Sequence, residues 1–139
     1  MEKPGIIKGG KYSDDRGNLF FNNDFNASEV KRIYYIENTD TEFVRGWTGH
    51  KIEQRWFSAL QGSFTIRFVK IDNWETPSKD VEVLKFQLNS DNFNVLHMPK
   101  GYASAIQSNE KNSRLLVMAD YLLGEIADDY RFSIDYFKF

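Results

Sequence analysis

The chain has 139 residues, of which 41% are hydrophobic and 16% aromatic, and its formal net charge is −2. This length predicts one domain, residues 1–139, which buries enough surface to fold without a disulfide or a metal staple. The absence of cysteine excludes thiol nucleophiles, disulfide bonds and cysteine-ligated metal centres. The nearly balanced charge gives no overall field that would attract nucleic acid or an anionic membrane.

The opening segment, MEKPGIIKGG, lacks the apolar run of a signal peptide. No other stretch of the sequence is apolar enough to predict a membrane helix. We therefore expect a soluble, cytoplasmic protein with neither a nucleic acid nor a membrane as its partner.

Short runs rich in aromatic and β-branched residues follow one another along the chain, separated by turn residues. They predict strands at residues 18–22, 30–37, 54–60, 63–71, 81–88, 94–98 and 114–122. Short strands at near-regular spacing predict an all-β sandwich or barrel.

The run at residues 63–71 alternates as a half-buried strand does, with Phe64, Ile66 and Phe68 on one face. Arg67 falls on the other face, where it would point to solvent or into the mouth of a barrel. Helix is expected only as a short turn at residues 124–130. The aromatic tail that follows is too apolar to hang free, so we expect it to pack across its own sheet or a partner subunit.

Two segments carry most of the residues suited to chemistry, RGWTGHKIEQ at residues 45–54 and HMPKGYAS at residues 97–104. Their order and separation resemble the two signature motifs of the cupin superfamily, a family of small double-sheet barrels. The resemblance implies an all-β, double-stranded β-helix fold, the cupin or jelly-roll barrel.

Metal-binding cupins carry two histidines and a glutamate in the first motif and a third histidine in the second. The matching positions here are Thr48, His50, Glu53 and Ser104, so two of the four family ligands are missing. A divalent ion prefers three or four protein ligands, and no substitute is evident. No metal and no other cofactor is therefore expected.

A narrower resemblance rests on DDRGNLF at 14–20, KRIYYI at 31–36, LQGSF at 60–64 and DDYRFSIDYF at 128–137. These segments resemble metal-free cupins of the dTDP-4-keto-6-deoxyhexose 3,4-ketoisomerase family, which is related to the dTDP-4-dehydrorhamnose 3,5-epimerases. The chain length and the C-terminal segment resemble those of the ketoisomerases more than those of the epimerases. The resemblance implies a nucleotide-diphosphate sugar as ligand and a role in surface-polysaccharide synthesis. It also implies a homodimer in which strands cross between subunits.

Both reactions need a base poised near neutral pH and a donor for the developing oxyanion. Histidine suits the base role because its unperturbed pKa is ~6.5. The ketoisomerase pattern has two histidines after Arg-Gly; the first is Thr48 here and the second is His50. We predict that His50 is the base, with Tyr35, Tyr121 or Tyr102 as the proton donor.

Arg16 and Arg45 fall on family positions and are predicted to bind the pyrophosphate, because guanidinium groups make bidentate contacts with phosphate. Lys51 and Arg67 are expected to complete a basic mouth. The other predicted substrate contacts are Thr48, Tyr102 and Ser104.

The hydroxyl residues Thr48 and Ser104 leave a second interpretation open. A barrel could keep its sugar-nucleotide pocket and lose its base, which would make it a non-catalytic binding module. A 3,5-epimerase is the alternative among enzymes, and deuterium exchange into a keto sugar separates these hypotheses.

Overall fold

The computed structural model describes residues 2–139, which form strands and irregular connections without a helix. Within that range, no helix has the length and hydropathy that a membrane crossing requires. The strands are β1 (Gly5–Ile7), β2 (Gly10–Asp14), β3 (Gly17–Phe21), β4 (Arg32–Ile36), β5 (Val44–His50), β6 (Arg55–Gln61), β7 (Ser63–Lys70), β8 (Leu84–Asn89), β9 (Val95–Met98), β10 (Tyr102–Ser108), β11 (Arg114–Ala119) and β12 (Tyr130–Arg131).

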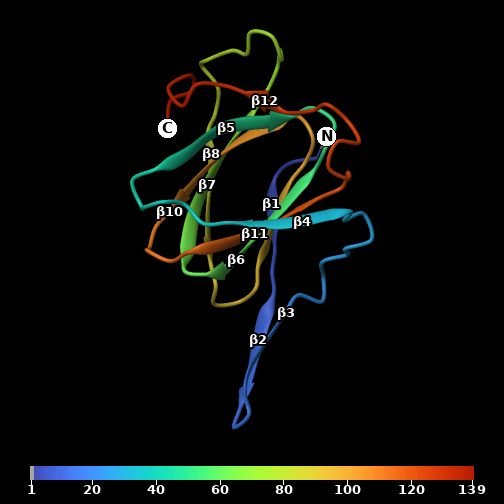
Figure 1. The fold of residues 1–139 in the computed structure, drawn as a ribbon, viewed down its shortest axis with the longest axis vertical. Coiled ribbons are helices and arrows are strands. Elements are labelled where there is room, and N and C mark those ends of the chain that lie inside the picture. The colour runs from blue at the N-terminus through green and yellow to red at the C-terminus, as the bar shows by residue number, and fades with distance from the viewer. Residues whose placement is uncertain (1) are drawn as a thin grey trace.

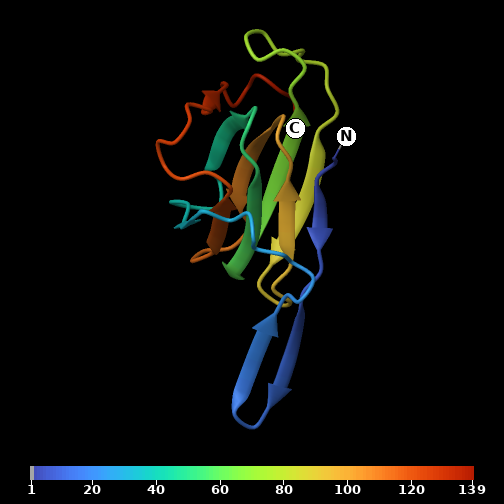
Figure 2. The ribbon, with the colours of Figure 1, turned by 90° about the vertical axis from the view of Figure 1, so that its right-hand side faces the viewer.

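Two five-stranded antiparallel sheets face each other (Figures 1 and 2). One sheet has the order β1-β9-β6-β11-β4 and the other has the order β12-β5-β10-β7-β8. Strands distant in sequence are neighbours in both sheets, as expected for a jelly roll rather than a meander. The all-β cupin fold predicted from the motifs is confirmed.

The core lies between the inner faces of the two sheets. Phe64, Ile66 and Phe68 of β7 are completely buried, as their alternation predicts. Phe68 meets Phe57 of the opposite sheet with ring centroids 6.1 Å apart. Burial of large aromatic side chains on both inner faces holds the two layers together.

Strands β2 and β3 form a separate hairpin that projects from the barrel (Figure 2). Its turn contains Gly17 at a φ of 132°, a backbone conformation that favours glycine. Tyr12 and Leu19 leave 58% and 59% of their surface exposed. The hairpin therefore presents apolar surface that this chain does not cover.

The C-terminal tail packs across the outer face of its own sheet, the first of the two alternatives expected for it. Phe137 is 2% exposed, and its ring meets that of Trp47 edge-on at 5.2 Å. The Trp47 indole N–H donates to the carbonyl of Ile134 at 3.2 Å. These contacts fix the tail to β5.

The short helical turn predicted at residues 124–130 is wrong. The segment contains only a turn closed by the Glu125 amide, which donates to the Leu122 carbonyl at 3.1 Å. Gly124 has a φ of 81°, which ends any helical path. The chain beyond it runs irregularly into β12.

The predicted strands correspond to β3, β4, β6, β7, β8, β9 and β11, with end differences of a few residues. The short strands β1, β2 and β12 and the two longer strands β5 and β10 were not predicted. Strand β5 contains two glycines, and β10 is rich in small residues and buried on both faces, so neither shows alternation.

Candidate functional site

A cavity of about 1200 Å³ lies between the inner face of the barrel and the segment that follows β11. Side chains from β4, β5, β6 and β10 line it, together with residues 122–132. Its polar lining residues include Arg32, Tyr34, Arg45, Thr48, His50, Glu53, Arg55, Ser104 and Asp128.

An irregularity in the pairing of β5 with β10 brings the motif residues to one face. Thr48 pairs with Ser104 and His50 pairs with Tyr102, but Arg45 pairs with Ile106. The extra residue on β5 makes a bulge, so that Arg45 and Thr48 line the same cavity although three positions separate them. The bulge places an arginine, a hydroxyl and a histidine along one strand.

His50 is 6% exposed and is held by the backbone of a distant segment. Its Nδ1 lies 2.9 Å from the carbonyl oxygen of Asp128. A carbonyl oxygen can only accept, so Nδ1 carries the proton and donates it. The neutral imidazole then has its lone pair on Nε2, which is the atom available to act as a base.

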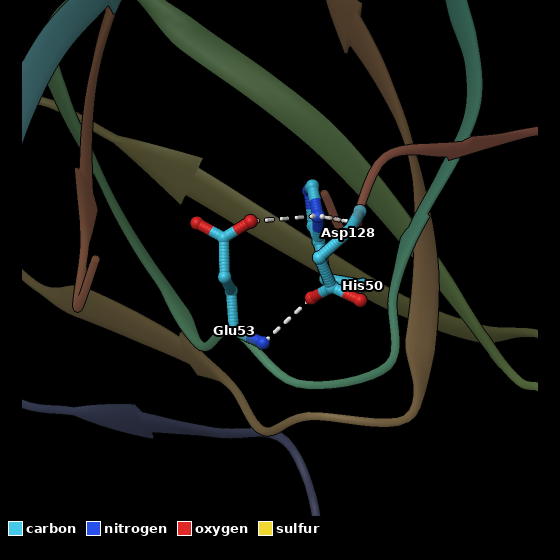
Figure 3. Close-up of side chains that lie close together, drawn as sticks. All are labelled: His50, Glu53 and Asp128. Carbon is cyan, nitrogen blue, oxygen red and sulfur yellow. Dashed lines mark hydrogen bonds and ion pairs between the residues drawn. The ribbon is translucent and has the colours of Figure 1, made fainter. Parts of the chain in front are cut away.

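The carboxylate of Asp128 holds the turn after β5 (Figure 3). Its oxygens accept hydrogen bonds from the backbone amides of Lys51, Ile52 and Glu53 at 2.9, 2.8 and 2.7 Å. Asp128 is only 2% exposed. Its carbonyl and its carboxylate therefore fix both the imidazole of His50 and the chain that follows it.

Glu53 connects His50 to a buried arginine. Its Oε1 accepts from Nη1 of Arg55 at 3.1 Å, and its Oε2 lies 3.8 Å from Nδ1 of His50. Glu53 and Arg55 are 8% and 5% exposed, so the ion pair is inside the protein. A buried charge of this kind needs its partner, because removing either would leave the other uncompensated.

The environment lowers the pKa of His50 below its usual value near 6.5. Burial is the largest cause, and the positive charge of Arg55 acts in the same direction. The hydrogen bond to Asp128 and the charge of Glu53 oppose the shift without reversing it. His50 is therefore neutral at pH 7 and competent to accept a proton.

His50, Glu53 and Asp128 bring potential ligand atoms within 4.8 Å of one another. The oxygens of Asp128 already accept three backbone N–H groups, and Nδ1 of His50 faces a carbonyl. Only Nε2 of His50 and one carboxylate edge of Glu53 would remain as ligands. These donors do not fit a divalent ion, which prefers three or four protein ligands.

Among the predicted site residues, His50, Arg45, Thr48 and Ser104 all line the cavity. Tyr35 lies at its rim, 59% exposed, with the Arg114 guanidinium 5.2 Å from its ring centroid. Strand alternation turns the neighbouring Tyr34 toward the core instead, where it lines the cavity.

The structure does not bring the other predicted residues to the cavity lining. Tyr102 is buried in the core beside Phe68, and burial raises the pKa of its hydroxyl. Tyr121 lies near Lys31, whose ammonium is 5.8 Å from its ring centroid.

The basic residues predicted at the mouth are also dispersed. The Lys51 side chain is exposed, and Arg67 packs on the outer face against Phe139, with its guanidinium 4.3 Å from the ring centroid. Arg16 lies in the turn of the β2–β3 hairpin, where it pairs with Asp14 at 2.7 Å. Within one chain, Arg16 is therefore remote from His50.

Sequence analysis missed Asp128, Arg55 and Tyr34 as site residues. Alternation along β4 could have distinguished Tyr34 from Tyr35, because Arg32, Tyr34 and Ile36 share a half-buried face. No local signal connects Asp128 to His50, since 78 positions separate them.

The comparisons with known proteins agree with this architecture. Residues 2–139 match the family model described as FdtA: WxcM-like, C-terminal, and the chain belongs to this family. No curated protein sequence gives a match. The predicted family resemblance is confirmed.

Solved structures of sugar-nucleotide enzymes are similar to this chain. A histidine-to-asparagine variant of the 3,4-ketoisomerase QdtA from Thermoanaerobacterium thermosaccharolyticum, in complex with TDP-4-keto-6-deoxyglucose, is 25% identical with a TM-score of 0.74. That alignment covers 98% of this chain and 92% of the other. The TDP-quinovose 3,4-ketoisomerase WlaRB from Campylobacter jejuni is 24% identical over 98% of each chain, with a TM-score of 0.71. A dTDP-4-dehydrorhamnose 3,5-epimerase from Bacillus anthracis is 16% identical over 91% of this chain and 76% of that one, with a TM-score of 0.70.

Proposed function

We propose that this protein is a metal-independent nucleotide-sugar 3,4-ketoisomerase that acts on a dTDP-4-keto-6-deoxyhexose. The observation that carries the proposal is the hydrogen bond from Nδ1 of His50 to the Asp128 carbonyl, which leaves Nε2 unprotonated in a residue that lines the cavity. Family membership and the TDP-sugar complex of QdtA support the substrate class.

In the proposed reaction, Nε2 of His50 removes the proton on C3, which lies beside the C4 ketone. The C3–H electron pair forms the C3=C4 bond, and the carbonyl electrons move to O4, giving an enediolate. The proton of the O3 hydroxyl is then transferred to O4 and a proton adds to C4, which leaves a ketone at C3 and a hydroxyl at C4. The reaction is a balanced isomerisation that needs no redox partner.

Proton donors for the oxygens must come from the cavity lining. Three tyrosines line it. Tyr34 lies on the inner face of β4, whereas Tyr35 lies at the rim and the ring of Tyr130 packs against Trp74 at 4.7 Å, so the observations favour Tyr34 as the donor. Arg45 lines the cavity and remains exposed, which suits it to the diphosphate.

A homodimer accounts for the surfaces that the isolated chain leaves uncovered. Strand β4 is at the edge of its sheet, and Ile33 and Tyr35 on its outer face are 67% and 59% exposed. Unpaired apolar edges are prone to association. We propose that a second copy covers this edge and that its projecting hairpin carries Arg16 to the neighbouring cavity. A cytoplasmic role in making sugars for surface polysaccharides follows from the proposed substrate.

The hydroxyl pair Thr48 and Ser104 favours a second candidate, a sugar-nucleotide-binding module without catalysis. Proton NMR with dTDP-4-keto-6-deoxyglucose in deuterated buffer separates the candidates. Loss of the C3 proton signal with new 3-keto resonances is the result expected for the ketoisomerase. Exchange at C3 and C5 without keto migration would indicate an epimerase, and line broadening without exchange would indicate the binding module. The absence of both binding and exchange would overturn the proposed substrate class.

A further inference from the structure

Arg55 is a buried cation beside the proposed base. It opens β6, on which Arg55, Phe57 and Ala59 face the barrel interior. Its side chain is among the cavity-lining residues, although the whole residue is only 5% exposed. Charged side chains are seldom buried to this extent unless they bind a partner.

The ion pair with Glu53 uses only part of the Arg55 guanidinium. Nη1 donates to Oε1 of Glu53 at 3.1 Å and to the carbonyl of Gln54 at 3.2 Å. A guanidinium has five N–H donors, and in the part of the chain that the structure describes, neither Nε nor Nη2 has a protein acceptor. Neither atom is among the fully buried, unpartnered side-chain atoms of the described residues, so both are open to the cavity, where an oxygen-bearing ligand can accept from them.

The position of these Arg55 donors relative to His50 indicates which oxygen of a bound substrate they would contact. The carboxylate of Glu53 lies between the two residues, with one oxygen toward Nη1 of Arg55 and the other toward Nδ1 of His50. Because Arg55 and His50 line the same cavity, we infer that the Arg55 guanidinium faces the same part of a bound substrate as the base does. The exposed Arg45 is better suited to the diphosphate, which is distant from those carbons.

We propose that Arg55 is a catalytic residue whose free N–H groups bind the C4 carbonyl oxygen of the substrate and stabilise the enediolate oxygen formed there. This inference rests on the proposed function. Thr48 and Ser104 supply only neutral hydroxyls at the positions where family members carry histidines. Arg55 supplies the positive charge that a developing oxyanion requires. In this scheme His50 carries the proton removed from C3. Arg55 donates hydrogen bonds to the oxygen and transfers no proton.

The test compares Arg55→Gln and Arg55→Lys with a surface control, Lys85→Gln. Lys85 is exposed on the edge strand β8, away from the cavity lining. Turnover is followed by NMR, dTDP binding by calorimetry and folding by thermal unfolding. We expect Arg55→Gln to lower kcat by about 100-fold or more with dTDP affinity unchanged, and Arg55→Lys to recover part of the loss. Lys85→Gln should match the wild type.

If Arg55→Gln unfolds, the double variant Glu53→Gln/Arg55→Gln takes its place, because it removes both buried charges together. A kcat within about threefold of the wild type in either variant would overturn the proposal. So would a fall in dTDP affinity that accounts for the whole effect, because Arg55 would then bind the diphosphate.

The proposed function is tested separately by measuring turnover and C3 exchange of the wild-type protein. If both are absent, the proposed function is overturned but the role of Arg55 in binding is not. Binding then decides the role of Arg55. Arg55→Gln should lower the affinity for dTDP-4-keto-6-deoxyglucose by about tenfold more than it lowers the affinity for dTDP. If the variant and the wild type bind the keto sugar with equal affinity, the assignment is overturned.

Discussion

The main-chain oxygen of Asp128 lies 2.9 Å from Nδ1 of His50, and the carboxylate of the same residue accepts the amides that follow His50 in sequence. One buried residue thus determines the tautomer of the proposed base and the path of the chain beside it. Because the carbonyl can only accept a hydrogen bond, the proton stays on Nδ1 and Nε2 is left free to act as a base.

Replacing His50 by asparagine or alanine should abolish turnover while leaving the barrel folded. Positioned general bases contribute about 10²–10⁴-fold to rate, and no other histidine lines the cavity among the described residues. NMR turnover and circular dichroism measure the two effects. Undiminished turnover in His50→Asn would contradict the assignment.

Replacing Asp128 by alanine should lower both stability and kcat. The change removes acceptors for three buried amides, and hydrogen bonds to a charged group contribute about 1.5–3 kcal/mol each, so a loss of at least about 2 kcal/mol is expected. Denaturant unfolding measures this loss.

The neighbouring Asp129→Ala is its matched control, because Asp129 pairs with Arg131 at an exposed position and should cost less than about 1 kcal/mol. Equal destabilisation by the two substitutions would argue against the role given to Asp128.

Activity should persist below the pH at which an ordinary histidine becomes protonated. Because burial lowers the pKa of His50, the acidic limb of the kcat/KM profile should fall below pH ~6.5. A pH series of NMR rates gives the position of this limb. A limb above pH 7 would be inconsistent with the buried environment of His50.

The same shift in the pKa of His50 makes a prediction for stability. Protons bind more weakly to the folded than to the unfolded state, so the stabilising contribution is complete above pH ~6.5 and is lost as the pH falls toward the folded-state pKa. His97 contributes in the same direction, since burial also lowers its pKa. Unfolding free energies of His50→Asn should therefore depend less on pH in this window than those of the wild type.

Two inactive subunits should complement each other if the hairpin acts in the neighbouring cavity. Arg16→Gln and His50→Asn each impair every site of their own homodimers. A mixed dimer has one cavity with an intact His50 and an intact Arg16 from the other subunit, so refolding a mixture should restore activity. Recovery no greater than the sum of the separate homodimers would place Arg16 outside the reaction, and a monomer in solution would remove its proposed route to the cavity.

The sequence predicted the parts of the fold that depend on local alternation. Strand β7 follows from Phe64, Ile66 and Phe68, whereas β10 contains mainly small residues buried on both faces and has no periodic signal. The motifs located His50, Arg45, Thr48 and Ser104. Their shared face depends on the bulge in β5, which is a property of its pairing with β10.

The remaining site residues depend on tertiary structure. Arg55 follows His50 closely in sequence, but its direction into the cavity is set by the start of β6. Asp128 reaches the site only because the chain after β11 turns back over the barrel. Charge and spacing alone could not distinguish either residue from an ordinary surface group.

The contacts of Phe137 with Trp47 determine how the protein should be handled for purification. The segment that carries Asp128 is continuous with a tail clasped to β5, and Phe139 also lies 5.9 Å from the Trp47 ring. Removal of residues 137–139 would loosen these contacts and release the carbonyl that orients the histidine. Preparations in which proteolysis has spared these residues should therefore show the highest specific activity.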